Sequence, residues 1–238
     1  MSLNKDIKAI IWDYDGTLLD TRQKNLNVTR NIIKDISGRN PDEISILDDA
    51  NKYHLITMQS ANWRELYQDV FQLSEEQINE AGSLWTDYQL GDDTPVTVFD
   101  GIKQGISALG DIPQGIVSQN SKSNVCHHLE KEELLQYFRY VVGYEEVEID
   151  KQKPDPDGLI NCIEKLIDSK SGVIFYIGDH ETDIQCVMNA KKLLQSADLR
   201  IFSIGAHYGS DLDGSLWKLQ PDYEARKVQD VFNIITDY

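Results

Sequence analysis

The sequence contains no long hydrophobic run, which limits where the protein is expected to work. A helix needs about 20 predominantly apolar residues to cross a bilayer, and no stretch of these 238 residues approaches that length. The N-terminal segment MSLNKDIK also lacks the apolar run of a secretory signal peptide. We therefore expect a cytoplasmic protein that does not enter a membrane.

Cysteine is scarce in this chain. Cys126, Cys162 and Cys186 are odd in number, lie far apart and occur in helix-like contexts. Disulfide frameworks of secreted domains use denser cysteines in even numbers. We interpret all three as core thiols in a reducing cytosol.

Basic residues are few compared with acidic ones. The chain has 23 lysines and arginines against 40 aspartates and glutamates, and its formal net charge is −17. Such a charge repels nucleic acids and anionic lipid surfaces, so neither is an expected partner. Any phosphate-binding site must be made locally positive by a metal ion, a lysine or backbone N–H groups.

The composition that is present is typical of a folded globular protein. Apolar residues make up 40% of the chain, with four tryptophans and eleven tyrosines. A chain of this length can bury a full core, either as one large domain or as a domain with a substantial insert.

The most informative stretch is AIIWDYDGTLLDT, residues 9–21. An apolar segment of strand length runs into Asp13 and Asp15, just before Gly16. Side chains two positions apart on an extended chain point the same way, so the two carboxylates share a site. Like charges held together need a cation, a shared proton or open water, and Mg²⁺ prefers oxygen ligands of this kind.

Residues 21–95 are predicted to be entirely helical. A first helix should end at Gly38, and an apolar stripe from Trp63 to Phe71 indicates another. Ser74 and Gln77 have the spacing of a capping box that opens the next helix. We predict that this segment forms a separate helical domain.

From residue 96 onward, strand-like and helix-like segments alternate. The run Val173–Ile177, VIFYI, is apolar enough for a central parallel strand, and a last helix is predicted over Glu224–Ile235. This alternation is typical of βαβ units around a parallel sheet. Residues 1–20 and 96–238 are therefore expected to form an α/β core, with the helical domain inserted after the first strand.

Further reactive residues follow the later strands. Ser118, in GIVSQNS, and the N–H of Gln119 could bind a phosphate oxygen at a helix start, although Ser118 could equally cap that helix. Lys153, in KPDP, supplies a positive charge. Asp179, in GDHETD, could complete a magnesium site with Asp13.

These motifs resemble the four signatures of the haloacid dehalogenase-like (HAD) hydrolases, in their chain order. DYDGTLLD at residues 13–20 resembles the first, Ser118 the second, Lys153 the third, and Asp179 with Asp183 the fourth. The resemblance implies a Rossmann-like, doubly wound core with an α-helical C1 cap at residues 21–95. Four motifs in order are a far stronger signal than any one alone.

The resemblance also implies residue roles. Asp13 would be the nucleophile of a phosphatase and Asp15 its general acid and base, with Lys153, Ser118 and Gln119 binding the phosphoryl group. Mg²⁺ would be held by side-chain oxygens of Asp13 and Asp179 and by the backbone carbonyl of Asp15. Asp183 is expected one shell further out, holding Lys153 or a metal-bound water.

The expected function is that of a Mg²⁺-dependent phosphatase similar to phosphoglycolate phosphatases, acting on a small phosphorylated metabolite as a monomer or homodimer. Asp15 argues against a dehalogenase, which lacks this second aspartate. A phosphomutase of the β-phosphoglucomutase type and a binding or regulatory module with weak turnover are the alternatives. The adjacent His127 and His128 are predicted to lie on a helix surface and not to bind metal.

Overall fold

The structure is a computed structural model that describes residues 6–60, 62–194, 198–209 and 217–238. The chain divides into two compact units, a core unit of Met1–Asp20 with Val98–Tyr238 and a helical unit of Thr21–Thr97. The two-residue strands β2 (Leu19–Asp20) and β3 (Thr97–Val98) lie where the chain passes between the units. The helical unit thus spans Thr21–Thr97, and the cap expected from the sequence spans residues 21–95.

The core unit is built on a parallel sheet with the strand order β5-β4-β1-β6-β7-β8. Its strands are β1 (Ile7–Trp12), β4 (Gln114–Val117), β5 (Phe138–Val142), β6 (Ser171–Gly178), β7 (Asp198–Ala206) and β8 (Tyr223–Ala225). The predicted α/β fold, with a Rossmann-like parallel sheet and a helical insert after the first strand, is confirmed.

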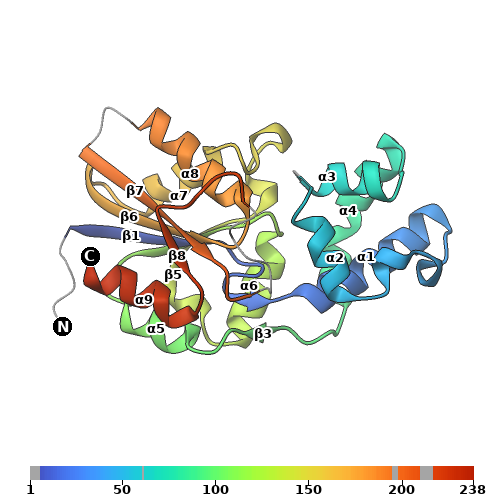
Figure 1. Ribbon diagram of the computed structural model, residues 1–238, viewed down its shortest axis with the longest axis horizontal. Coiled ribbons are helices and arrows are strands. Elements are labelled where there is room, and N and C mark those ends of the chain that lie inside the picture. The colour runs from blue at the N-terminus through green and yellow to red at the C-terminus, as the bar shows by residue number, and fades with distance from the viewer. Residues whose placement is uncertain (1–5, 61, 195–197, 210–216) are drawn as a thin grey trace. The chain divides into compact units, whose positions relative to one another are not determined.

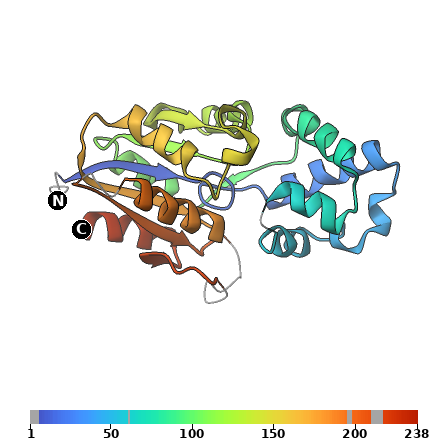
Figure 2. The ribbon, with the colours of Figure 1, turned by 90° about the horizontal axis from the view of Figure 1, so that it is seen from above.

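Helices cover both faces of the sheet, and Figure 1 shows α7 and α8 on one side and α5 and α9 on the other. The helices are α5 (Ile102–Ala108), α6 (Lys122–Lys131), α7 (Asp157–Leu166), α8 (Glu181–Leu193) and α9 (Val228–Asp237), with short 3₁₀ helices η4 (Leu135–Tyr137), η5 (Tyr144–Glu146) and η6 (Ile149–Lys151). Ile11 of β1 packs in a cluster with Leu159 of α7 and Val187 of α8. The neighbouring Trp12 instead lies 5.9 Å, between ring centroids, from Phe232 of α9. Alternate side chains of β1 are therefore buried against opposite helical layers. Figure 2 shows β1, in blue, in the middle of the core unit.

The helical unit has its own apolar core. It contains α1 (Arg22–Ser37), η1 (Pro41–Glu43), η2 (Ser45–Leu47), α2 (Ala50–Thr57), α3 (Trp63–Glu65), the π-helix η3 (Leu66–Val70) and α4 (Glu75–Gly91). Gly38 ends α1 with a φ of 69°, and Ser74 with Gln77 forms the predicted capping box of α4. The stripe from Trp63 to Phe71 is divided between α3 and the π-helix and is not one continuous α-helix, but Tyr67 and Phe71 remain buried.

The C-terminal segment differs from the sequence-based prediction. Tyr223–Ala225 pairs in parallel with Ile204–Ala206 as strand β8, so the last helix begins only at Val228. Local propensity does not reveal this pairing, because its partner strand is distant in the chain. Within the described part of the chain, no helix combines the length and apolar character needed to cross a membrane.

The cysteines follow the prediction in part. Cys162 and Cys186 are free thiols in the core, whereas Cys126 is only half-buried. Cys126 lies on α6 within the electrostatic influence of Lys122 and Glu146. The expectation that all three are core thiols is therefore wrong for Cys126.

Asp222 provides a test of how β7 is held near the edge of the sheet. Its carboxylate accepts hydrogen bonds from the N–H and hydroxyl of Ser203, at 2.7 and 2.9 Å, and from Lys191 at 2.7 Å. Partial burial opposes ionisation, but these donors hold the pKa of Asp222 below its ordinary value. Asp222→Asn should lower the free energy of unfolding at pH 7 by about 1–2 kcal/mol, as measured by urea denaturation.

The pH dependence of this loss is part of the test. Because the pKa of Asp222 is lowered in the folded state, its stabilising effect is complete above the ordinary aspartate pKa and is lost as the pH falls through the folded value. The difference between the variant and the original protein should therefore shrink in acid. Asp237→Asn, on the exposed face of α9, is the control. An equal loss in that variant would contradict the assignment.

Candidate active site

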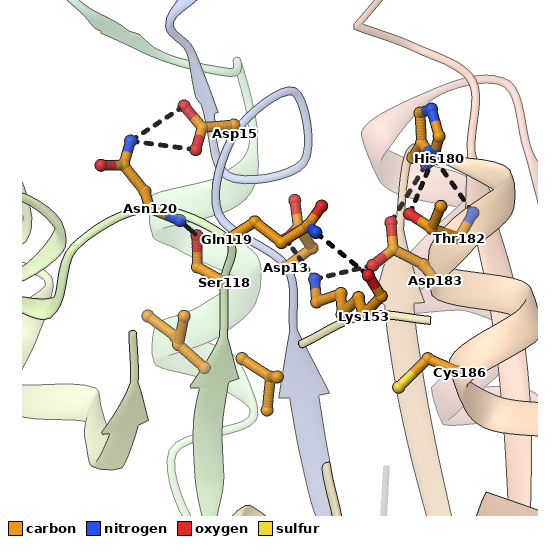
Figure 3. Close-up of polar contacts among 12 residues, drawn as sticks. Asp13, Asp15, Ser118, Gln119, Asn120, Lys153, His180, Thr182, Asp183 and Cys186 are labelled. Atoms are coloured by element: carbon orange, nitrogen blue, oxygen red, sulfur yellow. Dashed lines mark hydrogen bonds and ion pairs between the residues drawn. The ribbon is translucent and has the colours of Figure 1, made fainter. Parts of the chain in front are cut away.

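The carboxyl ends of neighbouring strands bring the predicted residues together. Asp13 and Asp15 follow β1, and Asp179 follows β6, the next strand in the sheet. Lys153 reaches this edge from the loop before α7. Figure 3 shows the Lys153 side chain directed toward Asp13, with Asp183 on one side and Asp15 on the other.

Lys153 makes the central contacts of the site. Its ammonium group donates to Asp13 Oδ1 at 2.6 Å and to Asp183 Oδ1 at 2.7 Å, and the lysine is only 7% exposed. Two other lysines have carboxylate partners of their own, since Lys122 pairs with Glu146 and Lys151 with Asp155. The positive charge beside Asp13 is thus that of Lys153, the lysine of the KPDP motif.

The acidic residues beside Lys153 fit a divalent cation. Asp13, Asp179 and Asp183 present carboxylate oxygens that lie within 4.8 Å of one another. Gly16 approaches so closely that a Cβ there would lie 1.9 Å from Asp179 Oδ2, and its φ of +72° favours glycine. The turn after β1 is therefore shaped around Asp179. Oxygen donors of this kind suit Mg²⁺.

Burial explains why these carboxylates need a positive partner. Desolvation raises the pKa of Asp13 to about 7, with Lys153 opposing the rise and the charge of Asp183 adding to it. Desolvation also raises the pKa of Asp179 well above its ordinary value, and the charges of Asp13 and Asp183 reinforce the shift. Burial alone would lower the pKa of Lys153, but its two aspartate partners outweigh burial and keep the pKa raised. A cation at the cluster would favour the ionised carboxylates.

Asp183 is held by three donors, and its expected place outside the metal ligands stays a prediction. Besides Lys153, its Oδ1 accepts a hydrogen bond from the Tyr176 hydroxyl at 2.9 Å, and its Oδ2 accepts from the His180 N–H at 3.1 Å. Tyr176 lies within the apolar strand β6 and is fully buried. Tyr176 was not among the predicted site residues, and its signal in the sequence is a hydroxyl within the otherwise apolar run Val173–Ile177.

Ser118 and Gln119 join the loops at the site edge. The Ser118 N–H donates to the Val142 carbonyl at 2.9 Å, and its hydroxyl oxygen accepts from the Asn120 N–H at 3.0 Å. That contact stabilises the turn and leaves the hydroxyl proton available for donation. The Gln119 side-chain nitrogen donates to the Lys153 carbonyl at 3.1 Å. The predicted phosphate contacts of both residues remain predictions.

Tyr14, between the two aspartates, is anchored from α6. Its hydroxyl forms a hydrogen bond of 2.7 Å with His128 Nδ1, and the two rings are nearly parallel. His128 is 6% exposed, so its predicted place on a helix surface is wrong, whereas His127 is exposed as expected. Successive residues of a helix point in different directions, and His128 shares the inward face with Val125.

Comparison with known proteins identifies the family. The model of the haloacid dehalogenase-like hydrolases matches residues 10–192, which include every predicted site residue. The chain belongs to the haloacid dehalogenase-like hydrolase family. The resemblance inferred from the four motifs is thereby confirmed. A search of the curated proteins finds no match to this sequence.

Solved structures share the fold of this HAD hydrolase at low sequence identity. A predicted phosphoglycolate phosphatase from Haemophilus somnus is 18% identical, with a TM-score of 0.72 and coverage of 97% of this chain and 98% of its own. A predicted phosphatase from Clostridium acetobutylicum is 19% identical, with a TM-score of 0.72 and coverage of 97% and 99%. A HAD-superfamily hydrolase of subfamily IA from Geobacter sulfurreducens is 20% identical, with a TM-score of 0.60 and coverage of 98% and 99%.

The contact between Tyr176 and Asp183 can be tested by stability. Tyr176→Phe removes the hydroxyl donor from a buried carboxylate and should lower the free energy of unfolding by about 1–2 kcal/mol, as measured by urea denaturation. Tyr223→Phe, in the half-buried edge strand β8, is a matched control and should change stability less. Equal effects of the two substitutions would show that the hydroxyl of Tyr176 has no special part in holding Asp183.

Proposed function

We propose that the protein is a Mg²⁺-dependent phosphatase that hydrolyses a small phosphorylated metabolite through an aspartyl-phosphate intermediate. The observation that carries the proposal is the contact between Asp13 and the Lys153 ammonium beside Asp179. These three residues bring a nucleophile, a cation site and a positive charge together in a protein of net charge −17. Membership of the HAD hydrolase family and the fold shared with predicted phosphatases support this class of reaction.

In the first step, a carboxylate oxygen of Asp13 attacks the phosphorus atom. The new bond from this oxygen to phosphorus forms as the bond from phosphorus to the ester oxygen breaks. Lys153 and the Ser118 hydroxyl stabilise the charge on the phosphoryl oxygens. The carboxyl group of Asp15 gives its proton to the departing alkoxide, which leaves as an alcohol.

In the second step, water attacks the phosphorus atom of the aspartyl-phosphate. The carboxylate of Asp15 accepts a proton from this water as the bond between oxygen and phosphorus forms. The bond to Asp13 then breaks, which returns its carboxylate and releases inorganic phosphate. Asp15 thus recovers the proton that it gave in the first step.

The side chains of Asp13 and Asp179 and the backbone carbonyl of Asp15 would hold the cation. When bound, Mg²⁺ neutralises charge on the phosphoryl oxygens. Asp183 would keep Lys153 directed at the same group. We assign to the helical unit the part of a cap that excludes water and bulky substrates, so small metabolites are the proposed substrate class.

Asp13 is the residue that tests the reaction. Asp13→Asn removes the nucleophile and should lower phosphate release from a panel of alkyl phosphates and 4-nitrophenyl phosphate by roughly 10³-fold or more. The measurement is phosphate release in the presence of Mg²⁺, with Asp237→Asn as a charge-matched control. Unchanged activity of Asp13→Asn would refute the proposal.

Removal of divalent cations tests the acidic cluster. Treatment with EDTA should abolish phosphate release, because the cation would neutralise both the phosphoryl oxygens and the repelling carboxylates. Added Mg²⁺ should restore the activity. Full activity after the treatment, in protein shown by elemental analysis to be free of metal, would exclude a role for the cation.

A further inference from the structure

We infer that Asn120 is a positioning residue that aims Asp15 at the leaving group, an inference that rests on the proposed phosphatase function. Asn120 follows strand β4 and is only 3% exposed. Its Nδ2 lies 3.1 Å from Asp15 Oδ2 and 3.4 Å from Asp15 Oδ1 (Figure 3). The amide therefore donates toward both oxygens of the carboxyl group that handles the proton.

The orientation of the Asn120 amide is set by its other neighbours. Its Oδ1 accepts hydrogen bonds from the Ser121 N–H at 2.9 Å and from Asn124 Nδ2 at 3.2 Å. Because both neighbours are donors, the oxygen of Asn120 must face them and its nitrogen must face Asp15. Asn124 is itself fixed in the first turn of α6, where its N–H donates to Ser121 Oγ at 3.2 Å. A buried chain of amides thus connects the start of α6 to Asp15.

A neutral donor suits a residue that gives and regains a proton. An amide N–H can donate to the carbonyl oxygen of a protonated carboxyl group and to either oxygen of a carboxylate. The contact can therefore persist in both steps of the reaction. A cation in the same place, such as the ammonium that Lys153 presents to Asp13, would favour the ionised form. Asn120 fixes the direction of Asp15 without adding charge.

The dependence on the leaving group tests this role. A departing alkoxide needs the proton of Asp15, whereas 4-nitrophenolate is stable enough to leave without it. The value of kcat/KM reports the step in which the leaving group departs. Asn120→Ala should lower kcat/KM for an alkyl phosphate by about 10- to 100-fold more than kcat/KM for 4-nitrophenyl phosphate. Asn124→Ala, which removes one of the contacts that orient Asn120, should give the same pattern with a smaller change. Asn233→Ala, on the exposed face of α9, is the control and should change neither value.

An equal loss for both esters, or no loss for either, would overturn the inference, because a merely structural role does not discriminate between leaving groups. Circular dichroism and thermal unfolding establish that each variant is folded. If Asn120→Ala does not fold, the comparison of the two esters with Asn124→Ala decides the question. If the proposed function is wrong, the result is different: the unsubstituted protein releases no phosphate, or Asp13→Asn is fully active. Either result also overturns the inference about Asn120.

Discussion

The site depends on one buried ammonium group. Lys153 lies between Asp13 and Asp183, and all three side chains are almost completely buried. Buried charges are costly unless they are paired and hydrogen-bonded, so each of these groups is tolerated because of the others. In a chain with 40 acidic and 23 basic residues, this lysine also provides the local reversal of sign that an anionic substrate requires.

The strand order explains why Asp13 and Asp15, which follow β1, have different kinds of neighbour on the two sides of that strand. Strand β1 lies between β4 and β6. From the side of β4 comes Asn120, a neutral donor to Asp15. From the side of β6 come Asp183, which accepts from Lys153, and Tyr176, whose hydroxyl donates to Asp183. In the proposed reaction Asp15 changes its protonation state, and its partner is a neutral amide. Asp183, which holds the Lys153 ammonium in place, is an acidic residue.

Most of the fold and the central site residues could be predicted because their signals are local. Apolar strands that end in Asp13 and Asp179, the glycine at the end of α1 and the capping box of α4 are each visible within a few residues. Two of the errors concern contacts between distant segments. The inward position of His128 depends on Tyr14, and strand β8 depends on pairing with β7. No short window of sequence contains either partner pair.

The repulsion within the acidic cluster must be resisted by the scaffold. The raised pKa values of Asp13 and Asp179 show that burial and like charge disfavour the ionised cluster. Their strands, however, are anchored by fully buried side chains such as Ile11 and Ile177, and these pack at a density that leaves little freedom to shift. Gly16 further brings the turn after β1 against Asp179. The apolar strands β1 and β6 fix the positions of the Asp13 and Asp179 carboxylates at the edge of the sheet. Binding a cation or a proton therefore relieves the repulsion between these carboxylates more readily than a movement of the two strands apart.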